Sequence, residues 1–394
     1  MAKNRKVRVA VNGYGVIGKR VADAVVLQDD MELVGISDVT YDYRIRVAAQ
    51  SGYPIYASVP EKRAEMEQAR IPVTGPLHEL LKKVDLVVDC TPKGIGARNK
   101  AAYEQAGVKA IFQGGEKHEL AGYSFTAQVN YVGAIDRQFV RVVSCNTTAL
   151  CRIMNALNRR GWIKRARAVL LRRGTDPWES HKNGMINTAI PETKVPSHQG
   201  PDAQSVIEGL NITTMAGAGP YNLSHMHFAM VETTHPVSVD ELRHALWEEP
   251  RVAFVRATDG LVALNSVIEL MRDLKRPRND MWEVAVWEDA LASDGQELYL
   301  TFQVHNEAIT IPETVDAIRA MAGIERDAMK SIEKTDRSMG IVKSFLSRTI
   351  PEEAVHTAMG EALQEAETEF MEEGFKGAEE PTEPTRTPAQ VGAK

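Results

Sequence analysis

The sequence predicts an α/β protein whose first part is a doubly wound parallel sheet and whose second part is an α+β domain on a mostly antiparallel sheet. Three observations support this prediction. The chain opens with a strand, a glycine-rich turn and a helix, and strand and helix patterns then alternate to about residue 145. Strand-like alternation dominates the part that follows. The 394 residues are enough for two domains with full cores.

The first element pair carries a G-x-G-x-x-G motif formed by Gly13, Gly15 and Gly18. A strand is expected before it over residues 7–12, and a helix after it over residues 19–28. A second strand over residues 31–37 ends at Asp38, 20 residues after Gly18. In such a motif the first glycine permits a tight turn, the second lets the backbone approach a pyrophosphate, and the third allows close packing of the helix. The pattern therefore predicts a dinucleotide site on a Rossmann-type sheet.

Four residues with possible roles in a site come at the ends of expected parallel strands: Asp38, Thr91, Gly115 and Cys145. The later strands are expected over 84–90, 108–112 and 139–144, with a helix over 98–105. Ligands of open parallel sheets bind at the carboxyl ends of the strands. We therefore expect these four residues to lie along one crevice.

The second part is expected to contain strands and one helix, and the segment 175–204 is expected to consist of functional loops. Helices are predicted over 312–321 and 326–345, and these return to the first domain. The resulting division is 1–145 for dinucleotide binding, joined by 312–346, and 146–311 for catalysis. An acidic extension follows over 350–394, with an amphipathic helix over 351–373 and a disordered end.

Composition narrows the class of protein. The net charge is −6, and residues 345–394 carry eleven Glu and four basic residues, so the body is close to neutral and offers no basic face for nucleic acid. The three cysteines lack metal-ligand spacing, which favours a reducing compartment. Neither a long apolar run nor a cleavable signal pattern begins the sequence, so we expect a cytoplasmic protein without membrane contact.

Cys145 lies where a strand pattern stops and a helical pattern begins. The first N–H groups of a helix lack intrahelical partners and carry the positive end of its dipole, so we expect a lowered thiol pKa there. A buried structural cysteine is the alternative interpretation. A nucleophilic thiolate beside a nicotinamide cofactor suggests attack on an aldehyde, followed by loss of hydride to give a thioester.

A base is needed for such a reaction, and His225 and His227 are candidates on one face of an expected strand. Two alternatives stay open. The histidines could be satisfied structural residues of the core, or, less favoured, a metal pair, because no third ligand accompanies them at suitable spacing. Arg172 and Arg173 end another expected strand and could bind an anion bidentately, or could form a solvated basic strand end. The loop Pro196–Gly200 offers further donors for phosphate.

The chain resembles the archaeal-type (type II) glyceraldehyde-3-phosphate dehydrogenases from about Val7 to about Phe345. The segments that carry this resemblance are AVNGYGVIGKRVADAV, DLVVDCTPKGIGA, AIFQGGEKHE, RVVSCNTTALCR, INTAIPETKVPSHQGPD, HMHF and DLKRPRND. The resemblance implies a homotetramer that oxidises glyceraldehyde 3-phosphate to 1,3-bisphosphoglycerate with inorganic phosphate and NAD or NADP, and the reverse reaction.

The resemblance also implies residue roles. Cys145 matches the nucleophile and His225 the catalytic base. Ser144, Asn146, His198 and Gln199 match substrate-binding positions, and the cofactor-contact positions include Val16, Ile17, Gly115, Arg173 and Asn306. Arg172 is added to the expected substrate site because its guanidinium could bind an anion.

The chain departs from the family pattern in three places. Asp38 stands where familiar members have lysine, and a carboxylate suits the ribose hydroxyls of NAD while repelling the extra phosphate of NADP, so we predict a preference for NAD. Asn306 replaces a glutamine at a cofactor-contact position. The extension from about Pro351 has no counterpart in familiar members.

Two alternatives to a phosphorylating dehydrogenase stay open at this stage. One is a non-phosphorylating dehydrogenase, or one acting on a different aldehyde, on the same scaffold. The other is a partner-binding scaffold that acts through its C-terminal helix.

Overall fold

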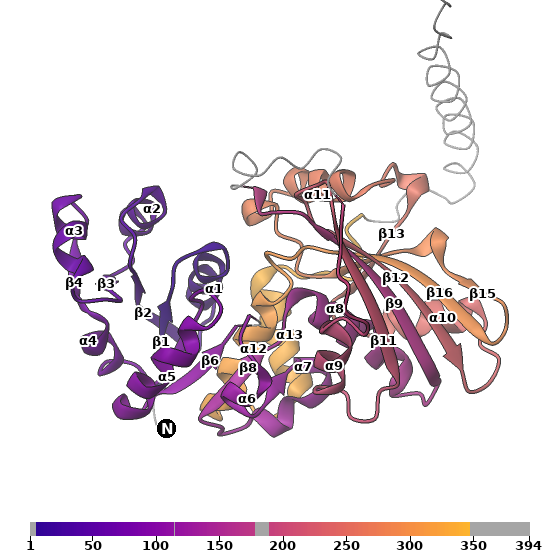
Figure 1. The fold of residues 1–394 in the computed structure, drawn as a ribbon, viewed down its shortest axis with the longest axis horizontal. Coiled ribbons are helices and arrows are strands. Elements are labelled where there is room, and N and C mark those ends of the chain that lie inside the picture. Colours follow the sequence, from indigo (N-terminus) through magenta and orange to yellow (C-terminus); the bar gives the residue numbers. More distant parts are fainter. Residues whose placement is uncertain (1–4, 114, 178–188, 347–394) are drawn as a thin grey trace, which may run out of the picture. The chain divides into compact units, whose positions relative to one another are not determined.

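The computed structural model describes residues 5–113, 115–177 and 189–346. The C-terminal extension, including its expected helix over 351–373, lies outside these residues. The described residues up to 257 and from 261 to 345 belong to one compact unit, which contains two eight-stranded sheets (Figure 1). The domain boundaries proposed from the sequence stay a prediction.

The first sheet is parallel throughout, in the order β4-β3-β2-β1-β5-β6-β8-β7. Its strands are β1 Val7–Asn12, β2 Met31–Asp38, β3 Ile55–Ala57, β4 Val73–Pro76, β5 Leu86–Asp89, β6 Lys109–Phe112, β7 Ser124–Phe125 and β8 Phe139–Val142. The helices between them are α1 Val16–Val26, α2 Tyr43–Gln50, α3 Lys62–Gln68, α4 Leu77–Leu81, α5 Ile95–Ala106, α6 His118–Ala121 and α7 Ala127–Asn130. The doubly wound parallel sheet is thereby confirmed.

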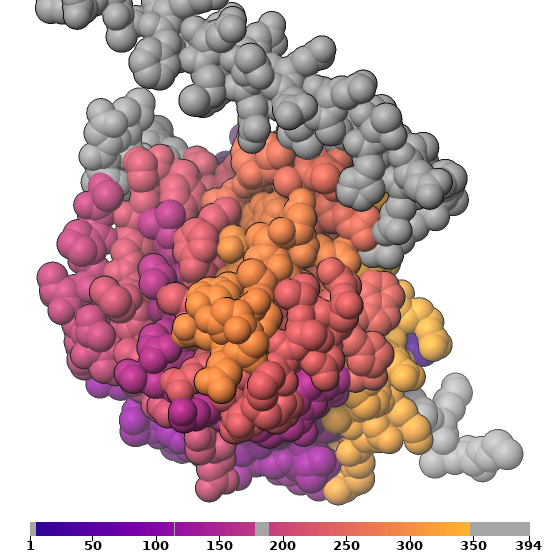
Figure 2. Space-filling model, turned by 90° about the vertical axis from the view of Figure 1, so that its right-hand side faces the viewer, coloured from indigo at the N-terminus to yellow at the C-terminus, as the bar shows by residue number. Residues whose placement is uncertain are grey.

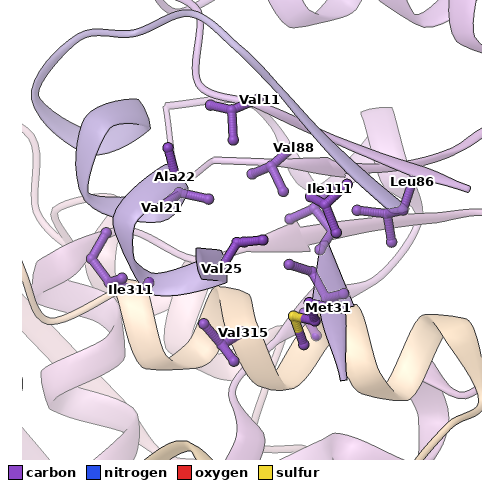
Figure 3. Close-up of a cluster of buried hydrophobic side chains, with 14 of the residues drawn as sticks. Val11, Val21, Ala22, Val25, Met31, Leu86, Val88, Ile111, Ile311 and Val315 are labelled. Atoms are coloured by element: carbon purple, nitrogen blue, oxygen red, sulfur yellow. The ribbon is translucent and has the colours of Figure 1, made fainter. Parts of the chain in front are cut away.

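The core beside this sheet is formed by apolar strand residues and by two helices from opposite ends of the chain. Val21 and Val25 of α1 pack with Val315 of α12 (Ile311–Ala322) on strand residues such as Val11 and Val88 (Figure 3). The helix α13 (Ala328–Met339) packs against α12. This last helix is shorter than the expected 326–345, because Gly340 with φ of 71° ends it in the left-handed conformation.

The second sheet is mostly antiparallel, in the order β10-β11-β9-β12-β16-β14-β13, with β15 also pairing with β16. Its strands are β9 Ile163–Arg173, β10 Ile190–Pro191, β11 Ile212–Gly219, β12 His225–Thr233, β13 Val252–Val255, β14 Val284–Trp287, β15 Ala292–Ser293 and β16 Glu297–Val304. The helices of this part are α8 Cys145–Asn158, α9 Gln199–Gln204, α10 Val239–Glu248 and α11 Leu264–Asp273. The segment 175–204 therefore contains β10 and α9, which corrects its prediction as loop alone.

One face of the second sheet is buried against α8 and α10, and the other exposes apolar side chains. On the buried face lie Ala168, Leu170 and Ala229. The opposite face carries a row of three paired apolar residues on neighbouring strands: Met215, which is 55 % exposed, and Val169 and Phe228, which are each 40 % exposed. Figure 2 looks onto the side of the molecule where β15, β16 and α10 lie at the edge of Figure 1. None of the described helices is long and apolar enough to cross a membrane.

Candidate active site

The glycine turn has the geometry that a dinucleotide site needs. Gly13 has φ of 93°, and a Cβ added there would lie 2.8 Å from the carbonyl carbon of Cys90. A Cβ on Gly18 would meet the Gly13 backbone, whereas a Cβ on Gly15 would meet nothing within 4 Å. The first and third glycines are therefore sterically required, and the second leaves open space in front of the α1 N-terminus. The residues present fit the phosphates of a dinucleotide.

Asp38 ends β2 and holds the glycine turn in place. Its Oδ2 accepts the Tyr14 N–H at 2.6 Å, and its Oδ1 accepts the N–H groups of Val39 and Thr40 at 2.7 and 3.0 Å. The carboxylate thus has a structural role that the sequence pattern did not reveal. Arg44 at the start of α2 lies close enough to interact electrostatically with Asp38, although it pairs with Asp42 at 2.6 Å.

Of the other residues expected to contact the cofactor, two line a cavity and two make contacts within the protein. Val16, at the first position of α1, and Asn306, just after β16, line one cavity together with Lys19 and His305. Ile17 packs partly buried against the core of the first sheet, and the Thr91 N–H donates to Asp89 Oδ1 at 3.0 Å.

Gly115 is not sterically required, because an added Cβ would stand 3.5 Å from the Lys93 Cβ, an ordinary contact.

Cys145 begins α8 directly after the first sheet's strand β8 and the N-cap residue Ser144. The Ser144 Oγ accepts the Thr147 N–H at 3.4 Å, which fixes the start of this helix. Burial raises the pKa of the Cys145 thiol, while Arg173, the backbone N–H groups of Asn146 and Cys145, and Arg172 act in the lowering direction. The expected lowered pKa was therefore wrong in direction, because removal of the thiolate from water outweighs the helix terminus and the arginines.

The histidine strand β12 faces the start of α8. His227 Nε2 and Asn146 Oδ1 are 2.9 Å apart, so the residue after the nucleophile is tied to the second sheet. His225 shares this face of the strand, two residues earlier. On β9, Leu170 pairs with His227, and the period of two places Arg172 on the same face as Leu170. Arg172 and Arg173 both act electrostatically on Cys145 and on His225. The structure thus brings the predicted nucleophile, histidine and arginines together.

The protonation of His225 follows from one contact. Its Nδ1 accepts the backbone N–H of Arg173 at 3.0 Å, so in the neutral ring the proton sits on Nε2. Burial, followed by His227 and the two arginines, holds the pKa of His225 well below its ordinary value. The ring is therefore neutral at pH 7 and offers an Nε2–H donor. A base at Nε2 would require the other tautomer and loss of the Arg173 contact.

The loop expected to bind phosphate lies at the start of α9. Gln199 is fully buried, and neither of its amide atoms has a hydrogen-bond partner among the described residues. His198, which precedes it, has its side chain 57 % exposed. The buried Arg141, which the sequence reasoning missed, joins β8 to this helix through Asp202 at 3.1 Å. A polar group in a strand of otherwise apolar residues was the available signal.

Within the part of the chain that the structure describes, no cluster of three or more His, Cys, Asp or Glu has the arrangement of a metal site. A glycine turn shaped for a dinucleotide, with a helix-start cysteine surrounded by arginines and a histidine, defines a dinucleotide-dependent oxidoreductase that works through a thiol.

Comparison with known proteins gives the family. The family model "Glyceraldehyde 3-phosphate dehydrogenase, C-terminal domain" matches residues 144–290, and "Dihydrodipicolinate reductase, N-terminus" matches residues 7–121. A glyceraldehyde-3-phosphate dehydrogenase of Methanobacterium bryantii is 51 % identical over 336 residues, which cover 85 % of this chain and 99 % of the relative. Glyceraldehyde-3-phosphate dehydrogenase 1 of Methanosarcina barkeri is 50 % identical over 339 residues, covering 86 % of this chain and 99 % of that protein. The chain belongs to the glyceraldehyde-3-phosphate dehydrogenase family.

Proposed function

We propose that the protein catalyses the phosphorylating oxidation of glyceraldehyde 3-phosphate with a nicotinamide dinucleotide, and the reverse reaction. The observation that carries this proposal is that Arg172 and Arg173 act electrostatically on both Cys145 and His225. The family model over residues 144–290 and the relatives that cover 85 % of the chain support it. When bound at the glycine turn, the dinucleotide supplies the hydride acceptor.

Each residue of the site has a separate proposed role in the reaction. Cys145 attacks the aldehyde as a thiolate, and Arg172 and Arg173 favour that charged form against the cost of burial. The His225 Nε2–H donates to the oxyanion that forms, so the carbon can lose hydride and become a thioester without a proton transfer to the ring. Phosphate then cleaves the thioester and releases the Cys145 thiolate.

Substitutions at Cys145 and His225, and the omission of inorganic phosphate, test this reaction. Cys145→Ser should abolish reduction of the dinucleotide by glyceraldehyde 3-phosphate while dinucleotide binding, measured by fluorescence quenching, persists. Turnover that survives in Cys145→Ser contradicts the assignment.

His225→Gln keeps a donor and should retain more activity than His225→Ala, which should lose about 100-fold or more in kcat. Without inorganic phosphate the enzyme should stop after one turnover. Continued turnover there would indicate the non-phosphorylating alternative.

We also propose NAD as the preferred cofactor, because Asp38 places a carboxylate at the end of β2 and repels a 2′-phosphate. Support comes from the described contacts of Asp38, which hold its charge in place beside the glycine turn. The ratio of kcat/KM for NAD to that for NADP should exceed 1 and should fall in Asp38→Asn. A wild-type ratio below 1 contradicts this proposal.

We propose that the protein works in the cytoplasm. We also propose that it assembles as a homotetramer. The row formed by Met215, Val169 and Phe228 supports association between copies, because exposed apolar side chains aligned across three strands favour burial. The twofold symmetry of most assemblies would place this sheet face against its own copy.

A further inference from the structure

Glu192 forms an ion pair with Arg172, the arginine whose guanidinium is proposed to bind the phosphate of a ligand. Its Oε2 lies 3.1 Å from Arg172 Nη2, and both side chains are partly buried, at 28 % exposed for Arg172 and 23 % for Glu192. A carboxylate and a phosphate compete for a guanidinium because both use the same N–H donors. Glu192 falls in a segment without a clear sequence pattern, so no role could be predicted for it.

The strand register explains why Glu192 reaches this position. Ile190 pairs with Ala218 of the central strand β11, and Arg172 pairs with the same residue from the other side. The Glu192 N–H then donates to the Ala216 carbonyl at 2.9 Å, so the chain stays alongside β11 beyond the end of β10. Glu192 is thus placed beside β11 by backbone contacts, and its side chain spans that strand to Arg172.

The groups around this ion pair can bind more negative charge than one carboxylate provides. Glu192 Oε1 is 3.7 Å from His198 Nδ1, so the carboxylate lies between this histidine and Arg172. The Nε–H of Arg172 is buried and lacks an acceptor among the described residues. Unpartnered buried donors are rare in proteins, and this one points to an anionic ligand that supplies the missing acceptor.

We propose that Glu192 is an internal competitor for phosphate: its carboxylate occupies Arg172 in the free enzyme and is displaced when a phosphate dianion binds. The inference rests on the proposed function, since it concerns the same anion site. The dianion is either the phosphate group of the aldehyde substrate or inorganic phosphate. By competing for Arg172, Glu192 weakens the hold on phosphate and favours release of the phosphorylated product.

Glu192→Gln tests this directly, because it keeps the shape and removes the charge. With NAD bound, KM for inorganic phosphate or KM for glyceraldehyde 3-phosphate should fall about three- to tenfold, with kcat for oxidation unchanged or lower. Calorimetric titration of inorganic phosphate into the same complex gives a readout independent of turnover. Glu333→Gln is the matched control, since it removes a carboxylate from an exposed position on α13.

The two sources of phosphate are separated by which KM changes. A fall confined to inorganic phosphate assigns Glu192 to the attacking phosphate, and a fall confined to the aldehyde phosphate assigns it to the substrate. Unphosphorylated glyceraldehyde should show no change in KM. In an Arg172→Gln background the benefit of Glu192→Gln should vanish, because the competition acts through that guanidinium.

Unchanged or increased KM values for both phosphates would overturn the proposal, as would an equal fall in Glu333→Gln or in the Arg172→Gln background. A wild-type enzyme without phosphate-dependent turnover would instead contradict the proposed function itself. Thermal unfolding of each variant checks that a change in KM does not come from loss of folded protein.

Discussion

At the scale of single residues, opposing electrostatic effects act on the pKa of the Cys145 thiol. Burial favours its neutral form, whereas two arginines and the first N–H groups of α8 favour the thiolate. The balance leaves the pKa above the ordinary thiol value in the protein without substrate. A phosphate dianion that replaces the Glu192 carboxylate on Arg172 would add negative charge there and weaken the lowering influence of Arg172 on the thiol pKa.

This balance predicts that the reactivity of Cys145 toward alkylating reagents increases with pH in the alkaline range. Because the thiolate is the nucleophile, the rate of alkylation by iodoacetamide should fall as pH drops below a midpoint above about 8.5, the ordinary thiol value. Arg173→Gln should move the midpoint further up. Cys145→Ser supplies the background from Cys90 and Cys151, whose pKa values are also raised by burial. A midpoint below 7 would contradict this account.

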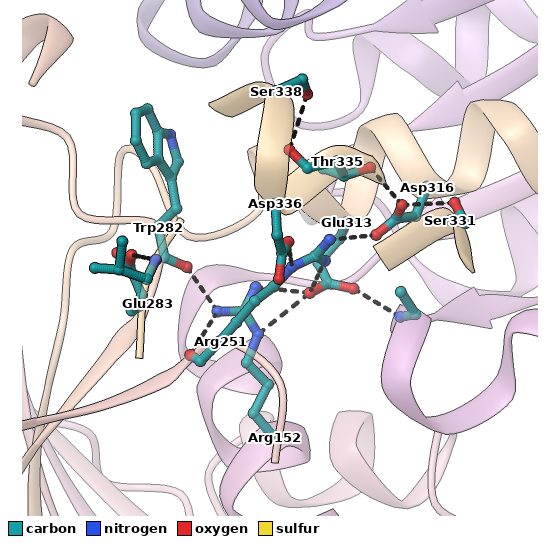
Figure 4. A network of polar contacts seen from close by, with 12 residues as sticks. Arg152, Arg251, Trp282, Glu283, Glu313, Asp316, Ser331, Thr335, Asp336 and Ser338 are labelled. Atoms are coloured by element: carbon teal, nitrogen blue, oxygen red, sulfur yellow. Dashed lines mark hydrogen bonds and ion pairs between the residues drawn. The ribbon is translucent and has the colours of Figure 1, made fainter. Parts of the chain in front are cut away.

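At the element scale, α8 is held at two places along its length. Asn146 contacts His227 near its start, and two turns later the fully buried Arg152 binds Glu313 of α12 at 2.6 Å. Arg251 joins the same Glu313 at 3.1 Å and adds Asp316 at 2.6 Å (Figure 4). Buried ion pairs of this kind are costly to break, since removal of one partner leaves an unpaired charge. The network therefore fixes the helix that begins with the nucleophile.

The exposed face of the second sheet supports a prediction about assembly. Phe228→Glu would place an unpaired charge in the proposed contact between copies, which costs about 3 kcal/mol or more and weakens association about 100-fold or more. Sedimentation velocity at micromolar concentration should show smaller species with unchanged circular dichroism. Val132→Glu, at a residue 69 % exposed elsewhere, is the control and should sediment like the wild type. An unchanged tetramer in Phe228→Glu would exclude this face as the contact.

The whole molecule carries buried histidines that make it sensitive to acid. Burial lowers the pKa of His227 and of His305 to about 3. Between pH 3 and 6.5 the unfolded chain binds protons that the folded state does not, so stability is present above 6.5 and is lost as pH falls. From pH 7 to pH 5 the two residues together should remove about 4 kcal/mol from the free energy of unfolding.

Urea unfolding at the two pH values measures this loss. His227→Gln should reduce the loss between pH 7 and pH 5 by about 2 kcal/mol, whatever its own effect on stability at pH 7. Equal stability of the wild type at pH 7 and pH 5 would contradict the neutral, buried state of these histidines.

The sequence allowed prediction of features that depend on neighbours along the chain. The glycine turn, the strand before Cys145 and the alternation around His225 are local, and the parallel sheet follows from them. The contacts that complete the site join distant residues. Arg152 and Glu313 are 161 positions apart, and the Glu192 to Arg172 pair depends on a two-residue strand. The direction of the Cys145 pKa depends on burial, which no local pattern reports.

The pairing of Arg152 with Glu313 has a consequence for synthesis on the ribosome. Cys145 and its helix emerge long before α12, so for the time needed to add more than a hundred residues Arg152 has no Glu313 to receive its charge. Until then α8 cannot be buried without leaving that charge unpaired. A truncated chain that ends before α12 therefore lacks the carboxylate that pairs with Arg152, and we expect the packing of α8 to form only after α12 has been added.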